Sequence, residues 1–310
     1  MIAAALACAC AKSEMEGNSI SFEPVSSKPT KAIISGTEYP TTESFVVSAY
    51  HNGTAAYFEG LTASYQSAIS LWETSTPEYW PLAGSLTFNA YSPASVSGLT
   101  IDASGVSATG YTVRTTEQMT TDLCYGSATV ADCSEHPAAV PLVFSHALSQ
   151  VVFRVKAAGY YSTATSTVDL AVTSLSLGGI CSVGDFSGGS WTNQGTESSY
   201  TLSDTSTQLT YDGENNPETV DVCSFLFIPQ TLGVDATLNV GFSISQTVSG
   251  TTYTLENSPV AVNLAGSVSE WQPGKKYIYT INVSMNNLIT FTASTVGWSD
   301  ESEEIIVEEN

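Results

Sequence analysis

The feature that most constrains the fold is the lack of helical periodicity along the chain. No stretch combines an apolar repeat of helical period with capping residues, and short segments of alternating apolar and polar residues follow one another instead. Short strands separated by turn residues are typical of β-sandwiches and barrels. We therefore expect an all-β protein. The strongest predicted strands are residues 45–50 (FVVSAY), 86–91 (LTFNAY), 151–156 (VVFRVK), 168–177 and 276–283 (KYIYTINV).

The length predicts two such domains in tandem. A chain of 310 residues is long for one sandwich and suits two. A turn-rich break at residues 135–138 (EHPA) lies near the middle of the strand series. We place the boundary at this break, with one sandwich ending at residue 140 and the second spanning residues 141–310.

The charge balance excludes two classes of partner. Acidic side chains outnumber basic ones by 30 to 8, so the formal net charge is −22 at pH 7. Nucleic acids and anionic membrane surfaces are both bound through clustered Lys and Arg. We therefore expect no nucleic-acid partner. Hydrophobic residues make up 42% of the chain, which argues against disorder.

The first eleven residues, MIAAALACACA, form a short apolar run that ends at a polar stretch. The run is too short to span a bilayer, which needs ~20 residues. It resembles the end of a bacterial lipoprotein signal peptide, in which a cysteine after small residues receives lipid. Cys10 is the expected lipidation site and Cys8 is the alternative. The basic segment that usually opens a signal is absent, which is consistent with a start further upstream, and a trimmed leader without function is the other interpretation.

Four cysteines remain after this leader: Cys124, Cys133, Cys181 and Cys223. An exported chain reaches a compartment that permits disulfides. Cys124 and Cys133 could close a small loop, and Cys181 and Cys223 could bridge neighbouring strands. Free buried cysteines are the alternative, because spacing alone cannot prove a pairing. No CxxC motif supports a zinc or thioredoxin-type site.

The histidines give little support for catalysis. His51 lies in a turn signal and His136 precedes a proline, so both are predicted to be solvated loop residues. His146 stands beside a predicted strand, where a hydrogen-bonded structural histidine is commoner than a general base. HExxH and GxSxG motifs are absent from the sequence. A triad assembled in space stays a weak alternative, and we expect a protein that is not an enzyme.

Two further clusters favour structural interpretations. Residues 212–216 (DGENN) lack the ligand spacing of a calcium loop, so a solvated turn is expected. Trp80 and Trp298 are typical of core or rim positions in a sandwich rather than of a sugar-binding platform. We expect neither a metal nor a cofactor.

Several segments taken together resemble the fimbrillin family, the type V pilins and fimbrillin-like lipoproteins of Gram-negative anaerobes. Their order and spacing extend over nearly the whole chain. The segments are the leader ending CAKSE, residues 30–33 (TKAI) with 45–50, residues 79–81 (YWP) with 86–93, residues 140–148 (VPLVFSHAL), residues 226–230 (LFIPQ), and residues 271–279 (WQPGKKYIY) with 296–298 (VGW).

The resemblance implies a fold and a route of assembly. The fold would be two tandem transthyretin-like β-sandwiches. The subunit would be carried to the outer membrane as a lipoprotein, and a trypsin-like protease would then remove its first strand. A strand from another subunit would fill the groove that this opens, so polymerisation would proceed by donor-strand exchange, a form of β-augmentation.

The family's functional positions map onto few residues of this sequence. Lys31 matches the cut position, where Arg is commoner in the family, and Ala32 would be the new N-terminus. The removed segment, residues 12–31, holds a strand with Ile20 and Phe22, and with Val25 as a further candidate. The retained sandwiches would span residues 32–140 and 141–310. The candidate donor strand is Ile305, Ile306 and Val307, and a last strand with an acidic tail is the alternative for this end.

These expectations combine into one predicted function. The chain is predicted to be a structural subunit of a surface fimbria that supports adhesion, with other pilin subunits, the maturation protease and the outer membrane as partners. The alternative is an uncut, lipid-anchored adhesin, or a tip or anchor subunit, that binds a host protein or glycan receptor. An exported hydrolase is a third class, which no motif supports.

Overall fold

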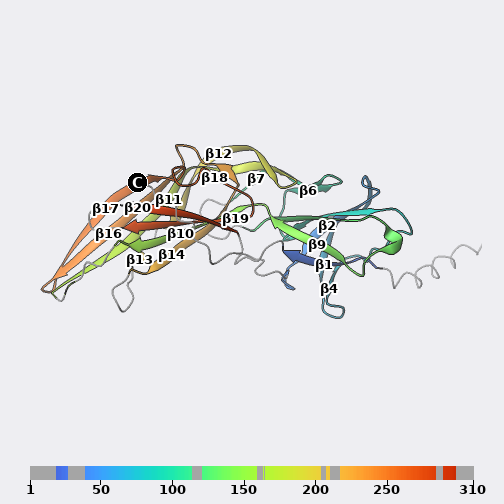
Figure 1. The fold of residues 1–310 in the computed structure, drawn as a ribbon, viewed down its shortest axis with the longest axis horizontal. Helices are drawn as coiled ribbons and strands as arrows, with labels where there is room; N and C mark the ends of the chain where they lie inside the picture. Colours follow the sequence, from blue (N-terminus) through green and yellow to red (C-terminus); the bar gives the residue numbers. More distant parts are fainter. Residues whose placement is uncertain are drawn as a thin grey trace, which may run out of the picture. The chain divides into compact units, whose positions relative to one another are not determined.

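The computed structural model describes residues 19–26, 39–113, 121–158, 163, 165–203, 207–209, 217–283 and 289–297. Within these ranges the chain forms twenty strands and a single short 3₁₀ helix (Figure 1). The all-β prediction is confirmed. None of the described residues belongs to a helix long and apolar enough to cross a membrane.

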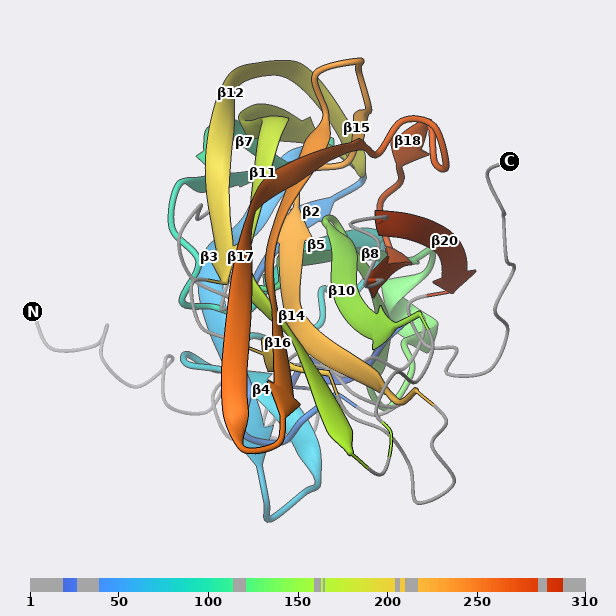
Figure 2. The ribbon, with the colours of Figure 1, turned by 90° about the vertical axis from the view of Figure 1, so that its left-hand side faces the viewer.

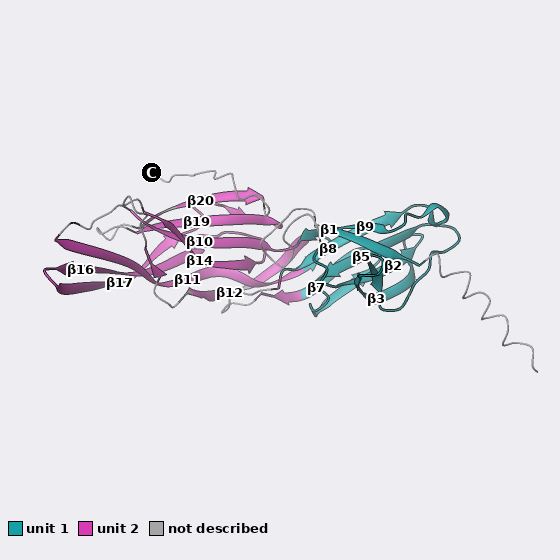
Figure 3. Cartoon of the chain, turned by 90° about the horizontal axis from the view of Figure 1, so that it is seen from below, with its two compact units in different colours: residues 1–109, 122–146, 186–189 teal, residues 110–121, 147–185, 190–310 magenta. Residues whose placement is uncertain are grey.

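The chain divides into two compact units (Figure 3). Unit 1 comprises residues 1–109, 122–146 and 186–189, and unit 2 comprises residues 110–121, 147–185 and 190–310. The predicted boundary after residue 140 falls at the start of strand β9 (Val140–His146), which belongs to unit 1. The reason is that β9 pairs with two strands of that unit, so its hydrogen bonds hold it there.

Unit 1 is built around a closed barrel of seven strands in the order β1-β4-β3-β2-β5-β8-β9. All neighbouring pairs are antiparallel except β1 and β9, which run parallel. The elements of unit 1 are β1 (Ser21–Ser26), β2 (Phe45–His51), β3 (Ala55–Gln66), β4 (Leu71–Thr74), β5 (Leu86–Ser92), β6 (Leu99–Asp102), β8 (Cys124–Val130), the 3₁₀ helix η1 (Cys133–Glu135) and β9; β7 (Gly105–Thr112) contributes to both units.

Alternation along the strands explains the core of unit 1. In β9, residues Val140, Leu142 and Phe144 are fully buried, and the residues between them face outward. β5 follows the same rule with Leu86, Phe88 and Ala90 inside. Successive side chains of a strand point to opposite faces, so an apolar residue at every second position supplies one buried face. Aromatic side chains dominate the core that results.

Unit 2 contains two larger sheets. One has the order β14-β10-β19-β20, and the other contains β17, β16 and β11 in that order, with β12 and β13 also paired to β11. Figure 2 shows β16 beside β17. The elements are β10 (Ser149–Ala157), β11 (Ser166–Ser187), β12 (Ser190–Ser203), β13 (Thr207–Gln208), β14 (Thr219–Phe227), β15 (Gln230–Thr231), β16 (Thr237–Val248), β17 (Thr251–Asn263), β18 (Glu270–Trp271), β19 (Lys275–Val283) and β20 (Ile289–Gly297).

Local sequence accounts for the long hairpin of β16 and β17. Its two turn residues, Ser249 and Gly250, have positive φ values of 50° and 80°. Two consecutive residues in this region make the turn whose twist matches that of paired strands, and glycine adopts it without strain. Elsewhere in unit 2, Trp271 stacks on Phe227 with ring centroids 4.8 Å apart, and its indole nitrogen donates to the Tyr279 hydroxyl at 3.1 Å.

The finer prediction of two tandem transthyretin-like sandwiches is not confirmed. Unit 1 closes into a barrel because β1 hydrogen-bonds on one side to β4 and on the other to β9. The first predicted strand therefore joins the two edges of an otherwise open six-stranded sheet. This position makes β1 the element of most functional interest.

Candidate functional site

β1 completes the barrel of unit 1 from a distant point of the sequence. Its antiparallel ladder with β4 pairs Ser21 with Glu73 and Phe22 with Trp72. Its parallel ladder with β9 runs from Phe22 opposite Val140 to Ser26 opposite Phe144. Residues of β9 thus lie more than a hundred positions away in the sequence, and the sequence alone does not indicate this pairing. We call the position between β4 and β9 the β1 site.

Ile20, which directly precedes β1, and Phe22 within it face the core and are 1% and 0% exposed. Ser21 between them is also buried, and Glu23, between Phe22 and Pro24, is exposed. Pro24 takes the third buried position, and Val25 is only partly buried. The prediction that Ile20 and Phe22 belong to one apolar strand face therefore agrees with the structure. Val25 was the wrong third candidate, because period-two alternation from Phe22 puts position 24 inside.

Phe22 is surrounded by aromatic rings. Its ring meets those of Phe45 and Phe88 edge to face, with centroids 5.6 and 5.5 Å apart. Phe45 in turn contacts Phe144, and Tyr39 stacks on Phe144, both at 5.4 Å. Edge-to-face aromatic pairs contribute about 0.5–1.5 kcal/mol each beyond the burial of their area. Phe22 therefore occupies a position that aromatic rings line.

Polar contacts fix the start of β1. The Ile20 amide donates to the Glu78 carbonyl at 2.7 Å, and the Ser21 hydroxyl donates to the Ala138 carbonyl at 3.0 Å. Ser19 forms an isolated bridge with Tyr79. These bonds satisfy backbone groups that would otherwise lose water on burial. They also set the register that directs Ile20 and Phe22 inward.

The arrangement defines what loss of β1 would expose. Without it, β4 and β9 would each present an unpaired edge, and the apolar walls around Phe22 would be uncovered. Exposed strand edges with apolar sides pair readily with another extended chain. An apolar residue at every second position is the pattern that such a chain needs. The β1 site is therefore suited to hold one extended strand, whatever its source.

Most other predicted site residues of the assembly route lie outside the described residues. These are the lipidation candidates Cys8 and Cys10, the cut position with Lys31 and Ala32, and the candidate donor strand with Ile305, Ile306 and Val307. Trp298 and residues 212–216 also lie outside.

All four cysteines after the leader are free thiols in the structure. Cys124 is the first residue of β8 and Cys133 lies beyond its other end, in η1. At ~3.4 Å per strand residue they are roughly 20 Å apart, whereas a disulfide needs Cα atoms about 4.4–6.8 Å apart. The predicted small loop between them is therefore wrong. Cys181 and Cys223 belong to β11 and β14 of unit 2, and both are unbridged.

His51 and His136 both make specific contacts. The His51 imidazole lies 3.0 Å from the Ala83 carbonyl through Nε2. The His136 ring stacks flat on Trp80, with centroids 4.7 Å apart and planes 3° from parallel. Trp80 itself is 6% exposed, in agreement with its predicted core role. The prediction that His136 is merely solvated missed this stack, which depends on a contact between distant segments.

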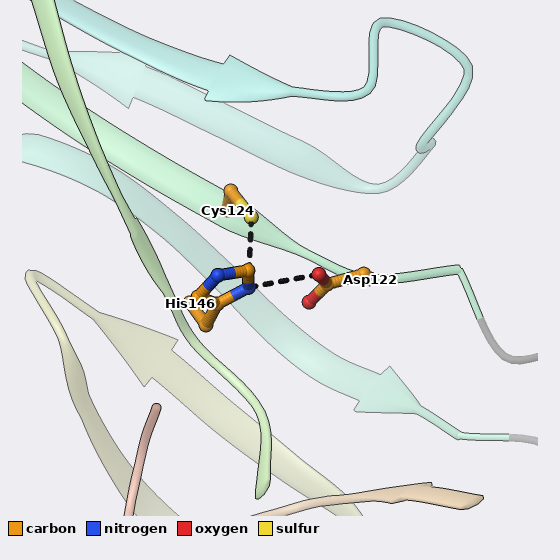
Figure 4. A network of polar contacts seen from close by, with 3 residues as sticks. All are labelled: Asp122, Cys124 and His146. Atoms are coloured by element: carbon orange, nitrogen blue, oxygen red, sulfur yellow. Dashed lines mark hydrogen bonds and ion pairs between the residues drawn. The ribbon is translucent and has the colours of Figure 1, made fainter. Parts of the chain in front are cut away.

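His146 belongs to a buried polar cluster with Asp122 and Cys124 (Figure 4). Its Nδ1 lies 2.8 Å from Asp122 Oδ2 and 3.4 Å from Cys124 Sγ. Burial, followed by the charge of Asp122, raises the pKa of the Cys124 thiol well above its ordinary value. The sulfur therefore stays protonated and buried, which is unsuitable for a nucleophile. His146 is hydrogen-bonded, as the sequence predicted, but neither of its partners was foreseen.

Together, these features define an all-β protein of two units, the first of which is completed by the chain's own N-terminal strand. The sequence profile of the fimbrillin-like family matches residues 30–298, and the chain belongs to this family. No curated protein sequence matches the chain.

Solved structures from several Bacteroides species have a similar fold. One, from Bacteroides uniformis and assigned to cell adhesion, has 16% identity and a TM-score of 0.50 and covers 90% of this chain and 98% of its own. A second, from Bacteroides ovatus with the same assignment, has 16% identity, a TM-score of 0.51 and coverages of 92% and 99%. An assigned adhesin from Bacteroides thetaiotaomicron has 9% identity, a TM-score of 0.51 and coverages of 95% and 98%. At these identities the likeness concerns the fold.

Proposed function

We propose that the chain is the precursor of a cell-surface fimbrial subunit in which β1 occupies the site of an incoming donor strand. The observation that carries the proposal is the position of β1 in the closed barrel. β1 is a short strand with Phe22 and Pro24 buried, and Ile20 is buried directly before it. It lies between β4 and β9, which are not neighbours of each other in the barrel order. In this role the protein is structural or adhesive rather than enzymatic.

Family membership and fold both support the fimbrial or adhesive role. The family is fimbrillin-like, and the solved structures of similar fold are assigned to cell adhesion. The profile match begins at residue 30, so β1 precedes the matched segment. That limit agrees with a mature subunit that starts near Ala32 after a cut behind Lys31.

The exchange has a clear physical basis. Loss of β1 would expose two sheet edges and the aromatic walls around the Phe22 position, which are unfavourable in water. A donor strand from another subunit would restore the ladders and the buried apolar area together. Residues 305–307 supply three consecutive β-branched apolar side chains and are the candidate donor. Cutting after Lys31 removes three Lys and three Glu, so the net charge stays at −22 and opposes random association.

Before exchange, the subunit would be held at the outer membrane by lipid on Cys10, or on Cys8. Lipoproteins carry several acyl chains, and a single chain gives only marginal binding. The two retained units would be those of the structure, with β9 kept in unit 1, and the transthyretin-like topology is the finer expectation. The assembled fimbria would then bind host receptors.

The N-terminal residue of protein recovered from the cell surface tests the proposal. Mass spectrometry of the terminal peptide should show a start at Ala32 in the polymer fraction. A Lys31→Ala variant should accumulate as an uncut precursor outside the polymer, and Lys28→Ala, next to Pro29, is the matched control. Recovery of only lipidated Cys10 or Cys8 from polymers would contradict strand removal.

A second experiment tests the β1 site directly. A chain that begins at Ala32 should bind a synthetic peptide of residues 19–26 in a ratio of one to one. The same peptide with Phe22→Asp should not bind, because a carboxylate would then be buried among aromatic rings. Equal binding of both peptides would show that Phe22 does not fill the site in the exchange.

One observation favours a second candidate, an uncut lipid-anchored adhesin or a tip or anchor subunit. With β1 in place the barrel of unit 1 is complete, so the uncut chain needs no partner strand to satisfy its edges. Such a protein would present lipid-modified Cys10 or Cys8 at its N-terminus and would bind its host protein or glycan as a monomer. The terminal-peptide measurement separates the two candidates.

A further inference from the structure

The strands β8 and β9 bring three chemically different side chains to one buried point. Cys124 opens β8, His146 ends β9, and the antiparallel register pairs these two residues directly. Asp122 lies two residues before Cys124. One ligand atom from each of the three lies within 4.8 Å of the others, and all three residues are buried. Figure 4 shows the carboxylate, the imidazole and the thiol turned toward one another.

We propose that Asp122, Cys124 and His146 form a binding site for a divalent transition-metal cation, with Zn²⁺ as the cation that best fits the donor set. Imidazole nitrogen, cysteine sulfur and carboxylate oxygen are the three ligand types that zinc takes in proteins. Magnesium and calcium prefer oxygen ligands alone, so a thiol argues against both. The inference does not depend on strand exchange.

The spacing of the donor atoms suits such an ion. Bonds of about 2.0–2.3 Å in a tetrahedral arrangement place neighbouring ligand atoms roughly 3.4–3.6 Å apart. His146 Nδ1 and Cys124 Sγ are 3.4 Å apart, and Nδ1 and Asp122 Oδ2 are 2.8 Å apart. A separation of the carboxylate and the ring by about half an ångström would therefore accommodate the metal.

Without a metal, the cluster leaves one buried carboxylate oxygen without a hydrogen-bond partner. The Cys124 thiol lies against both the His146 imidazole and the Asp122 carboxylate, and His146 Nδ1 contacts Asp122 Oδ2 at 2.8 Å. Asp122 Oδ1 is buried and has no hydrogen-bond partner among the described residues. The Asp122 side chain is only 1% exposed, so water does not easily satisfy this oxygen. A cation at the centre would engage all three groups together.

Binding also balances charge. The Cys124 S–H bond breaks, a sulfur–zinc bond forms and the proton leaves to solvent, while the carboxylate and the neutral imidazole bind through lone pairs. One thiolate and one carboxylate then offset the two positive charges of Zn²⁺ in a buried site. The bound ion would join the start of β8 to the end of β9 and stabilise unit 1.

Zinc and cobalt titrations of the chelator-treated full chain test the site. We expect one Zn²⁺ per chain, a higher melting temperature of unit 1 with zinc, and sulfur-to-metal absorption when Co²⁺ replaces zinc. Cys124→Ser should abolish the stoichiometric binding and the absorption. Cys133→Ser is the matched control, since it removes another buried thiol of unit 1 and should leave both unchanged.

X-ray absorption of the zinc-loaded wild-type chain identifies the atoms bound to zinc, so it tests the site even if Cys124→Ser fails to fold. One sulfur at about 2.3 Å with nitrogen and oxygen neighbours at about 2.0–2.2 Å supports the site. A shell without sulfur, or with more than one, overturns it. Wild-type protein that binds no zinc, or a folded Cys124→Ser variant that binds as tightly as wild type, would show that the cluster is a metal-free structural network.

Discussion

Truncation of Phe22 is the most direct test of how β1 is held. Phe22→Ala removes a fully buried ring from the centre of the β1 site, together with its edge-to-face contacts to Phe45 and Phe88. The backbone of β1 should still pair with β4 and β9, because the substitution leaves every amide in place. The change therefore isolates the contribution of one inward side chain to strand retention.

The expected loss is large. Phe-to-Ala changes in well-packed cores cost about 3–5 kcal/mol, and the two aromatic pairs account for about 1–3 kcal/mol of this. Every tenfold change in an equilibrium constant corresponds to about 1.4 kcal/mol. Opening of β1 should therefore become roughly 100-fold more frequent or more in the variant. The packing of unit 1 around the remaining core residues limits how far the cavity collapses.

Hydrogen exchange of the full chain reports opening amide by amide, so the opening of β1 is measured separately from unfolding of unit 2. Amides of β1 and of the paired segment of β9 should lose protection in Phe22→Ala. Glu23→Ala, at the neighbouring exposed position, is the matched control and should change the free energy of opening by less than about 0.5 kcal/mol. Equal protection in the two variants would refute the view that Phe22 anchors the strand.

Three further predictions concern other parts of the chain. Gly126→Ala should destabilise unit 1 by about 1–3 kcal/mol in urea unfolding, because an added Cβ would lie 2.6 Å from a backbone carbonyl oxygen of β9. Trp271→Phe should destabilise unit 2 by about 1–3 kcal/mol in the same assay, because the buried 3.1 Å bond to the Tyr279 hydroxyl is lost. The Asn193 amide, with a backbone amide, lowers the pKa of Asp185 below its ordinary value of 3.8, so the stabilisation is present above that value and is lost as the pH falls through the lowered pKa. An NMR titration should show the low pKa, and Asn193→Ala should raise it.

The all-β class follows from the sequence because strand alternation is a local property. A period of two in apolar residues fixes which side of an extended segment is buried, whatever lies against it. That is why Ile20 and Phe22 could be assigned to one buried face from the sequence. The same rule, applied strictly from Phe22, selects Pro24 rather than Val25 as the third inward residue.

Pairing between distant strands was decided by the tertiary structure. Nothing in residues 21–26 indicates that they run parallel to residues 140–144. Backbone hydrogen bonds form between the same N–H and C=O groups in almost any pair of strands, so the residue types do not specify the partner strand. Closure of the barrel depends on this pairing together with that of β1 and β4. The stack of His136 on Trp80 is likewise a contact between segments that the sequence keeps apart.

The sequence also does not predict that Asp122, Cys124 and His146 form a cluster. Asp122 and Cys124 are near neighbours in the sequence, but His146 joins them only through the register of β8 with β9. A register shift of one residue would turn the His146 side chain to the other face of the sheet, away from Asp122 and Cys124. Sequence alone therefore determined which residues are apolar, acidic or able to bind a metal. The tertiary structure decided which of them meet, because the energy of a contact depends on positions in space that only the complete set of strand pairings fixes.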